Sequence, residues 1–300
     1  MRSLLLRALA TLQLVRLPLA LAVGSDLWLA TLLTRWHPAA ADRPASQMQL
    51  WIAMALAGLV GGGMLGFAAG MNDLLDHRRD QAMNPGRPLP AGRMRTPHAA
   101  LVTFGSLLTA LMASAAFGDD SLRVALLAAA GIVVWNTGGR HVPALGIPMM
   151  GLAHAGVMFI PWPGQPFTLP ACLVFTQAVV SGALLHQRTG KRPALTQRSA
   201  AALALFAGVC VTGLVALGDR RGLFEGPGAW EPVGGVLPTA ALIWFVWQVR
   251  VAAMQSAPED SALALHRAVV ATPPAMAAAW CLSLGHVLAG AAFLGTAVAC

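Results

Sequence analysis

The residues best suited to chemistry lie in one short stretch of the chain, from Asn72 to Asp80. Three of the 12 acidic residues, Asp73, Asp76 and Asp80, fall in this stretch, directly after the apolar run Leu50–Gly70. Carboxylates are costly to place beside a bilayer, so a cluster of them at the end of an apolar helix indicates a functional site.

The spacing of these residues favours a metal ion. In a helix, Asn72, Asp76 and Asp80 share one face because they are four residues apart, and Asp73 lies close beside them. Their carboxylate and amide oxygens are hard ligands, which suit Mg²⁺ better than Zn²⁺. Mg²⁺ usually takes one or two protein carboxylates and completes its shell with waters and the phosphates of a substrate. We therefore expect Asn72, Asp73, Asp76 and Asp80 to hold Mg²⁺.

The loop after the acidic stretch supplies positive charge. Arg87 and Arg93 lie there among Pro and Gly residues. A planar guanidinium group can bind phosphate oxygens through two parallel hydrogen bonds, so the acidic residues and these arginines together predict a metal–diphosphate site. The alternative is a solvated helix end that carries mixed charges and binds no ligand.

The stretch Asn72–Asp80 resembles the first aspartate-rich motif of the UbiA superfamily of intramembrane prenyltransferases, N-D-x-x-D-x-x-x-D. The residues Asn84–Arg93 resemble the segment that follows this motif in the family. The resemblance implies an all-α, polytopic membrane protein, with about nine transmembrane helices in a UbiA-like bundle around a central cavity. It also implies that Asp73, Asp76 and Asp80 are catalytic and that the substrate is a prenyl diphosphate bound with Mg²⁺.

A second resemblance covers the segment Asn136–Gly151. It is similar to a stretch in the UbiA-like branch encoded in ebo-type bacterial gene clusters, where Lys or Arg followed by His precedes a Gly-Pro-rich helix start. Arg140 matches that basic residue, and we expect it to reach the diphosphate. The branch then carries two polar residues, at the positions of His154 and Val157 here. His154 therefore either lines the cavity or is a structural histidine of an apolar helix.

The first apolar run carries two more cavity candidates. Arg16, followed by Leu17 and Pro18, resembles the Arg-x-Pro start that is usual for the first helix of the family. Asp26 lies in the middle of the run, where a carboxylate should face the protein interior or a cavity. It is either a polar contact in the active-site cavity or a hydrogen-bonded structural residue.

The chain departs from the family at the second aspartate motif, D-x-x-x-D. Residues 121–218 contain no Asp or Glu. Gly182 and His186 take the positions of the two aspartates, and Arg188 and Lys191 follow them. We expect His186 to line the cavity and Arg188 and Lys191 to contact the diphosphate, where basic residues would replace the charge of one metal ion.

The composition supports a membrane protein. The 300 residues are 57% hydrophobic and 11% charged, and the apolar runs do not alternate as barrel strands would. At ~20 residues per span, they predict one transmembrane domain over residues 1–300, with a surface helix over Glu259–Ala271. The predicted spans are Leu12–Leu33, Gln49–Met71, Ala99–Phe117, Leu122–Asn136, Gly146–Pro163, Phe167–His186, Ala200–Leu217, Val233–Val249 and Met276–Ala299.

The net charge of +8 is carried almost wholly by arginine. With the N-terminus in the cytoplasm, about three quarters of the 20 Lys and Arg residues face that side, which predicts a cytoplasmic active site. We expect a multi-pass protein of the bacterial inner membrane, in contact with membrane lipids. The arginines are not interleaved with aromatic residues in a basic patch, so nucleic acid is not an expected partner.

The sequence thus predicts an enzyme, a prenyltransferase that transfers an isoprenyl group from a prenyl diphosphate to an unidentified small-molecule or lipid acceptor. A UbiA-type terpene cyclase would use the same residues without an acceptor. The other alternative is a non-catalytic membrane protein that binds or exports a lipid or small molecule. The missing second motif favours that alternative, and the complete first motif argues against it.

Overall fold

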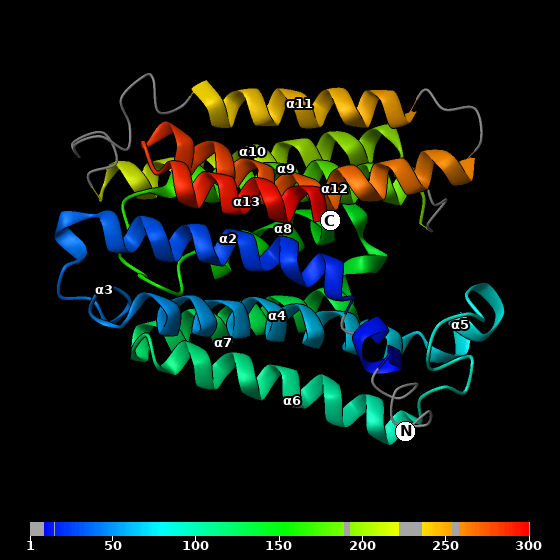
Figure 1. The fold of residues 1–300 in the computed structure, drawn as a ribbon. Helices are drawn as coiled ribbons and strands as arrows, with labels where there is room; N and C mark the ends of the chain where they lie inside the picture. Colours follow the sequence, from blue (N-terminus) through cyan, green and yellow to red (C-terminus); the bar gives the residue numbers. More distant parts are fainter. Residues whose placement is uncertain (1–8, 15, 189–192, 222–235, 254–257, 300) are drawn as a thin grey trace.

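The computed structural model describes residues 9–14, 16–188, 193–221, 236–253 and 258–299. These residues form helices and short 3-10 turns without any strand, which confirms the all-α prediction (Figure 1). The helices are α2 (Leu17–Trp36), α3 (Pro44–Gln47), α4 (Leu50–Leu75), α5 (His77–Met83), α6 (Thr96–Ala115), α7 (Asp119–Thr137), α8 (Pro143–Val157), α9 (Thr168–Arg188), α10 (Gln197–Asp219), α11 (Val236–Ala253), α12 (Pro258–Ser283) and α13 (Val287–Ala299), with 3-10 turns η1 (Pro38–Ala40) and η2 (Gly139–His141).

The long helices run roughly alongside one another, and neighbours in sequence often pack in pairs. Helix α4 packs on α6 and α2, α8 packs on α7 and α9, and α12 packs on α11, α13 and α2. In Figure 1, α6 lies along one side of the bundle and α11 along the other, with α2 and α8 between them. The short helix α5 lies beyond the end of α4, at one end of the bundle.

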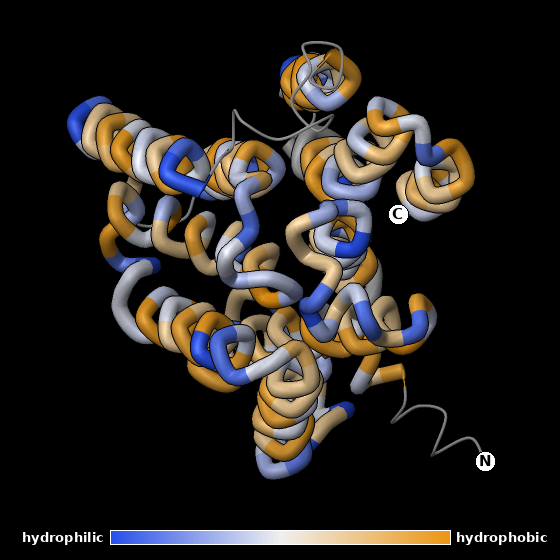
Figure 2. The backbone as a smooth tube through the Cα atoms, turned by 90° about the vertical axis from the view of Figure 1, so that its left-hand side faces the viewer, coloured by the Kyte–Doolittle hydropathy of each residue, from blue (hydrophilic) through white to orange (hydrophobic). Residues whose placement is uncertain are grey.

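The outward faces of the helices are apolar. Leu101, Phe104, Leu108 and Met112 recur along one face of α6, and each is exposed. So large an exposed apolar face on a helix is expected where lipid covers it. Viewed along the bundle, the helices are mainly hydrophobic, and hydrophilic residues gather toward their ends (Figure 2).

Among the described residues, four helices are long and apolar enough to cross a membrane: α4, α6, α9 and α10. The apolar parts of α11 and α13 are shorter. The chain therefore has the helices of an integral membrane protein, and the count of nine spans stays a prediction.

The C-terminal part differs from the sequence prediction. A separate surface helix over Glu259–Ala271 and a span over Met276–Ala299 were expected, but α12 is one continuous helix that covers the first and the start of the second. The polar start of this segment suggested a surface helix, yet Leu265 and Val270 are buried against the bundle. The break comes later, at Gly285, whose φ of 79° is a backbone conformation that favours glycine.

Glycines bring α4 and α6 close together. A Cβ on Gly63 would lie 2.6 Å from the carbonyl oxygen of Ser106, and a Cβ on Gly70 would meet the side chain of Thr103 at 2.1 Å. These glycines thus allow the close helix packing that small residues permit in lipid. The contact fixes the two ends of the loop that joins the helices.

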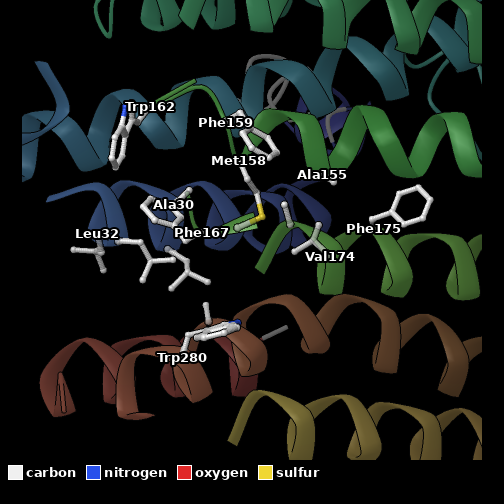
Figure 3. Close-up of a cluster of buried hydrophobic side chains, with 14 of the residues drawn as sticks. Ala30, Leu32, Ala155, Met158, Phe159, Trp162, Phe167, Val174, Phe175 and Trp280 are labelled. Carbon is white, nitrogen blue, oxygen red and sulfur yellow. The ribbon is translucent and has the colours of Figure 1, made fainter. Parts of the chain in front are cut away.

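A large apolar core holds α2, α8, α9 and α12 together. Figure 3 shows Ala30, Ala155, Phe175 and Trp280 among its members, drawn from these four helices. Interiors of this kind are close-packed, so the helices that carry the candidate site are held in fixed positions.

Candidate functional site

The acidic stretch lies where α4 ends and α5 begins. Asp76 is the residue between the two helices, with φ −90° and ψ 5°. The backbone hydrogen bonds nevertheless continue, from the Asp76 N–H to the carbonyl of Asn72 and from the Asp80 N–H to the carbonyl of Asp76. The chain therefore bends at Asp76 rather than continuing as the single straight helix expected from the spacing.

Arg87 joins two of the carboxylates. Its Nη1 lies 3.1 Å from Oδ1 of Asp73 and also contacts Oδ2 of Asp80. Both aspartates are buried, so the guanidinium supplies the counter-charge that they need. Arg16 adds a second contact to Asp73, at 3.3 Å, and Asn84 donates to Asp80 at 2.9 Å.

Arg140 lies beside the third carboxylate. Its Nη1 is 2.7 Å from Oδ1 of Asp76, a close charge contact that lacks the alignment of a hydrogen bond. Nε of Arg140 is buried and makes no hydrogen bond among the described residues. A buried guanidinium donor without a partner is costly, so this arginine has donor capacity that an anionic ligand could use.

Two glycines allow the turn that carries Arg140. A Cβ on Gly146, in the first turns of α8, would lie 2.1 Å from the carbonyl oxygen of Gly139 in η2. Only glycine at position 146 therefore lets the turn fold back onto the helix start. The sequence Gly-Gly-Arg-His at residues 138–141 is thus a tight connection that brings Arg140 to Asp76.

These groups line one polar cavity of about 250 Å³. The predicted residues in its wall are Asn72, Asp76, Asp80, Arg87, Arg140 and His186. Gly182 also lines it, so both positions that stand in for the second aspartate motif belong to the same cavity as the first motif. His186 is buried, and its Nε2 lies 2.8 Å from the carbonyl oxygen of Pro193.

A second, apolar cavity of about 250 Å³ adjoins the polar one. The two share Met150, Ala178, Gly182 and Leu185 in their walls. The apolar cavity extends between α2, α4, α8 and α9, and Met64 is one of the residues that line it. The pair of cavities thus offers a charged compartment next to a hydrophobic one, which suits an amphipathic ligand.

Asp26 and His154 are in contact with each other. Nε2 of His154 lies 3.0 Å from Oδ2 of Asp26, although the two residues are 128 positions apart. His154 lines the apolar cavity, and Asp26 is almost fully buried behind it. Both cavity candidates from the first and fifth predicted spans therefore meet at one place.

Two predicted phosphate-binding residues, Arg93 and Arg188, do not line the polar cavity. Arg93 is exposed and donates to the carbonyl oxygen of Gly86 within its own loop. Arg188 is exposed at the end of α9, and Lys191 lies outside the described residues. The arrangement therefore gathers Arg87 and Arg140 from the predicted cationic set.

The cavity wall also contains residues that the sequence analysis did not single out. Arg79 lies within the aspartate motif, and Asn84 opens the segment after it, so the motif itself could have indicated both. Trp135 and His141 flank the turn that carries Arg140. His141 follows Arg140 directly and matches the His that follows the basic residue in the ebo-type branch, so that resemblance could have indicated it.

The oxygen donors in the wall of the polar cavity bear on the predicted Mg²⁺ site. No group of three His, Cys, Asp or Glu side chains within the described ranges is arranged to hold a metal ion. Asn72, Asp76 and Asp80 nevertheless place hard oxygen donors on one cavity wall. Mg²⁺ needs only one or two protein carboxylates when phosphate and water complete its shell, so this donor set fits Mg²⁺ bound together with a phosphate ligand.

Comparisons with known proteins gave similarity in structure only. No protein-family model and no curated protein sequence matches the chain. A solved structure of digeranylgeranylglyceryl phosphate synthase in membranes is similar, with a TM-score of 0.57 and 14% identity over 98% of this chain and 99% of that chain.

Structures of a UbiA homolog from Archaeoglobus fulgidus are also similar over almost their full length. The one bound to GPP and Mg²⁺ has a TM-score of 0.47 at 16% identity, over 95% of this chain and 99% of that chain. The one bound to Cd²⁺ has a TM-score of 0.44 at 18% identity, over 97% and 98% of the two chains. At 14% identity, the likeness to the synthase shows that this chain shares its fold, and the likeness extends to the fold alone.

Proposed function

We propose that this chain is a Mg²⁺-dependent prenyltransferase of the UbiA type, which transfers an isoprenyl group from a prenyl diphosphate to a small-molecule or lipid acceptor. One observation carries the proposal: a cavity lined by carboxylates and guanidinium groups shares part of its wall with an apolar cavity. A prenyl diphosphate has the same two parts, a charged head and a hydrocarbon tail. The shared fold of the synthase supports the proposal without assigning the reaction.

In this proposal the chain's own residues hold and orient the diphosphate. Arg140 donates through its buried and unpartnered Nε, and Arg87 turns from the carboxylates toward a phosphate oxygen. Asn72, Asp76 and Asp80 would hold Mg²⁺, which when bound neutralises charge on the leaving diphosphate. The buried Asp73 then keeps Arg16 as its partner and holds the motif in place.

The polar cavity also contains the two residues at the positions of the family's second aspartate motif. Gly182 and His186 bring no carboxylate to face Asp76 and Asp80 across the polar cavity. We propose that guanidinium groups replace the charge of one of the two metal ions of the family, so that one Mg²⁺ binds with each diphosphate. We also propose that Lys191, which lies outside the described residues, contacts the diphosphate.

We propose one transmembrane domain over residues 1–300, with the N-terminus and the polar cavity on the cytoplasmic side of a bacterial inner membrane. The segment around Arg140 and His141 supports a place in the UbiA-like branch of ebo-type gene clusters. Transfer to an acceptor and cyclisation without one use the same cavity, and the product distinguishes them.

A non-catalytic binding protein is the second candidate, and one specific observation favours it. Asp73, Asp76 and Asp80 are each paired with an arginine, so the motif could serve only to stabilise the helix end. This candidate predicts that a prenyl diphosphate binds unchanged, or that none binds.

Binding of geranyl, farnesyl and geranylgeranyl diphosphate to the purified full chain, with and without Mg²⁺, tests the proposal. The Asp76→Asn variant should lose Mg²⁺-dependent binding. The matched control is Asp120→Asn, because Asp120 also pairs with an arginine, Arg123, but lies exposed away from the cavity.

Analysis of the products then identifies the reaction. A prenylated acceptor supports transfer, a cyclic hydrocarbon or alcohol supports cyclisation, and intact diphosphate supports the binding protein. Binding that is the same in Asp76→Asn and Asp120→Asn would overturn the assignment of the site.

A further inference from the structure

The contact between Asp26 and His154 lies apart from the aspartate motif, and neither residue lines the polar cavity. Asp26 is 1% exposed on α2, and its Oδ2 lies 3.0 Å from Nε2 of His154 on α8. A buried carboxylate needs a polar partner, and among the described residues the imidazole of His154 is the side chain that forms a hydrogen bond or ion pair with it.

The contact fixes the orientation of the imidazole ring. With the carboxylate accepting, Nε2 carries the proton and Nδ1 carries the lone pair. Nδ1 makes no hydrogen bond among the described residues. His154 lines the apolar cavity, so a basic nitrogen belongs to a compartment that is mainly hydrophobic. A carboxylate that holds a histidine in this way is the arrangement of a general base.

The wall of the apolar cavity offers little else that could take a proton. Among the described residues that line it, His154 is the only titratable one. Ser181 also lines this cavity, and its Oγ is buried without a hydrogen-bond partner. An unpaired hydroxyl in the wall of the same cavity as a basic nitrogen is suited to a polar group of a ligand that enters the cavity.

We propose that His154 is the base that deprotonates the acceptor, that Asp26 is the residue that positions it, and that Ser181 binds the acceptor's polar group. This inference rests on the proposed function. In the step, the C1–O bond of the prenyl diphosphate breaks and the diphosphate leaves with the electron pair. The acceptor's nucleophilic atom forms a bond to C1, and its proton passes to Nδ1 of His154.

The inference also specifies the class of acceptor. The acceptor must carry an ionisable O–H, N–H or activated C–H group, because a base is useful only where a proton is lost. It must also be mainly apolar, since it would reach C1 in the same cavity as the hydrocarbon tail, and that cavity is lined by residues such as Val23, Met64 and Val157. A phenol or an alcohol of a lipid satisfies both conditions.

Chemical modification tests the base without any knowledge of the acceptor. Diethyl pyrocarbonate is applied to the purified full chain, and carbethoxylation of each histidine is followed by mass spectrometry. His154 should react, should be protected by the unreactive analogue farnesyl thiolodiphosphate with Mg²⁺, and should react several-fold more slowly in Asp26→Asn. The exposed His98 serves as the internal control and should react equally in every sample.

The second measurement is turnover with labelled geranylgeranyl diphosphate and a total lipid extract as the source of acceptor. His154→Gln should lower product formation by about 10²- to 10⁴-fold while the Kd of the analogue changes less than about twofold. Asp26→Glu should restore more activity than Asp26→Ala if the carboxylate positions the ring. His98→Gln is the matched control and should leave turnover unchanged.

The outcomes separate the two proposals. Failure of the analogue to bind the wild-type chain would overturn the proposed function, and the base with it. If the analogue binds in an Asp76-dependent manner but leaves His154 unprotected, the base alone is overturned. Full turnover by a folded His154→Gln variant would also overturn the role of His154 as the base and leave the proposed function standing.

Discussion

Nη1 of Arg140 lies 2.7 Å from Oδ1 of Asp76, and this contact connects the turn before α8 to the end of α4. The contact links the aspartate motif to the segment around η2. The guanidinium group can still donate, because its Nε is buried without a hydrogen bond among the described residues. An incoming anion can therefore gain a hydrogen bond here.

Replacement of Arg140 tests this directly. Arg140→Gln should weaken the binding of farnesyl diphosphate by about 10- to 100-fold, because each charge-assisted hydrogen bond contributes about 1.5–3 kcal/mol. Isothermal titration in detergent measures the Kd. The control is Arg123→Gln, which removes an exposed arginine that also pairs with an aspartate. Equal affinities of the two variants would contradict a role for Arg140 in binding.

The number of metal ions is a second test. Because Gly182 and His186 replace the second pair of carboxylates, we expect one Mg²⁺ for each bound diphosphate. The stoichiometry can be read from Mn²⁺ substitution and electron paramagnetic resonance, where one site gives an uncoupled spectrum. Two fully occupied, coupled ions would show that other ligands replace the second motif.

Arg87 should be important for stability as well as for binding. Arg87→Gln leaves the buried Asp73 and Asp80 without their shared counter-charge, and breaking such a buried pair costs on the order of 3 kcal/mol. The melting temperature should fall clearly in the variant. Arg93→Gln in the same loop is the control, because Arg93 is exposed, and it should melt like the wild type. A stable Arg87→Gln variant would mean that the two aspartates are neutral or solvated.

The turn that carries Arg140 depends on glycine. Gly146→Ala places a Cβ at 2.1 Å from the carbonyl oxygen of Gly139, so η2 must move and Arg140 with it. We expect weaker diphosphate binding together with a lower melting temperature. Gly156→Ala in the same helix meets no atom within 4 Å and should be neutral or stabilising by up to about 1 kcal/mol. Unchanged binding in Gly146→Ala would show that Arg140 keeps its place without the tight turn.

The stability of the loop after α2 should depend on pH. Burial lowers the pKa of His37, and its Nδ1 accepts the N–H of Ala39, which requires the neutral ring. The unfolded chain therefore binds the proton more readily, so the contribution of His37 is present above about pH 6.5 and is lost as the pH falls. His37→Asn keeps an acceptor without titrating. The melting temperature of the wild type should fall more than that of the variant between about pH 7.5 and 5.5, and parallel curves would contradict this.

Much of the polar cavity could be predicted from the motif because spacing within one segment is a local property. The interval of four residues brings Asn72, Asp76 and Asp80 to one wall, and the bend at Asp76 preserves the backbone hydrogen bonds that this requires. Arg93 shows the limit of such reasoning. It lies in the expected loop, but turn geometry directs it to Gly86 rather than to the cavity.

The contact between Asp26 and His154 could not be predicted as a pair. Each residue was unusual in its own apolar run, but the approach of α2 to α8 depends on packing across the whole bundle, which no local pattern specifies. The extent of α12 escaped prediction for a similar reason. The polar residues near its start are typical of a surface helix, and only the burial of Leu265 and Val270 shows that the helix belongs to the bundle.

The ion pairs of the aspartate motif affect the order in which ligands bind. They join Asp73 to Arg16, Asp76 to Arg140 and Asp80 to Arg87. In the ligand-free protein the charges of these three ion pairs cancel, and Arg79 leaves the wall of the polar cavity with a small positive excess. A bare diphosphate would add several negative charges to a site with so small an excess. A magnesium–diphosphate complex would add far less, and its metal could exchange places with the guanidinium groups. On the proposed function, the cavity therefore selects its substrate in the metal-bound form.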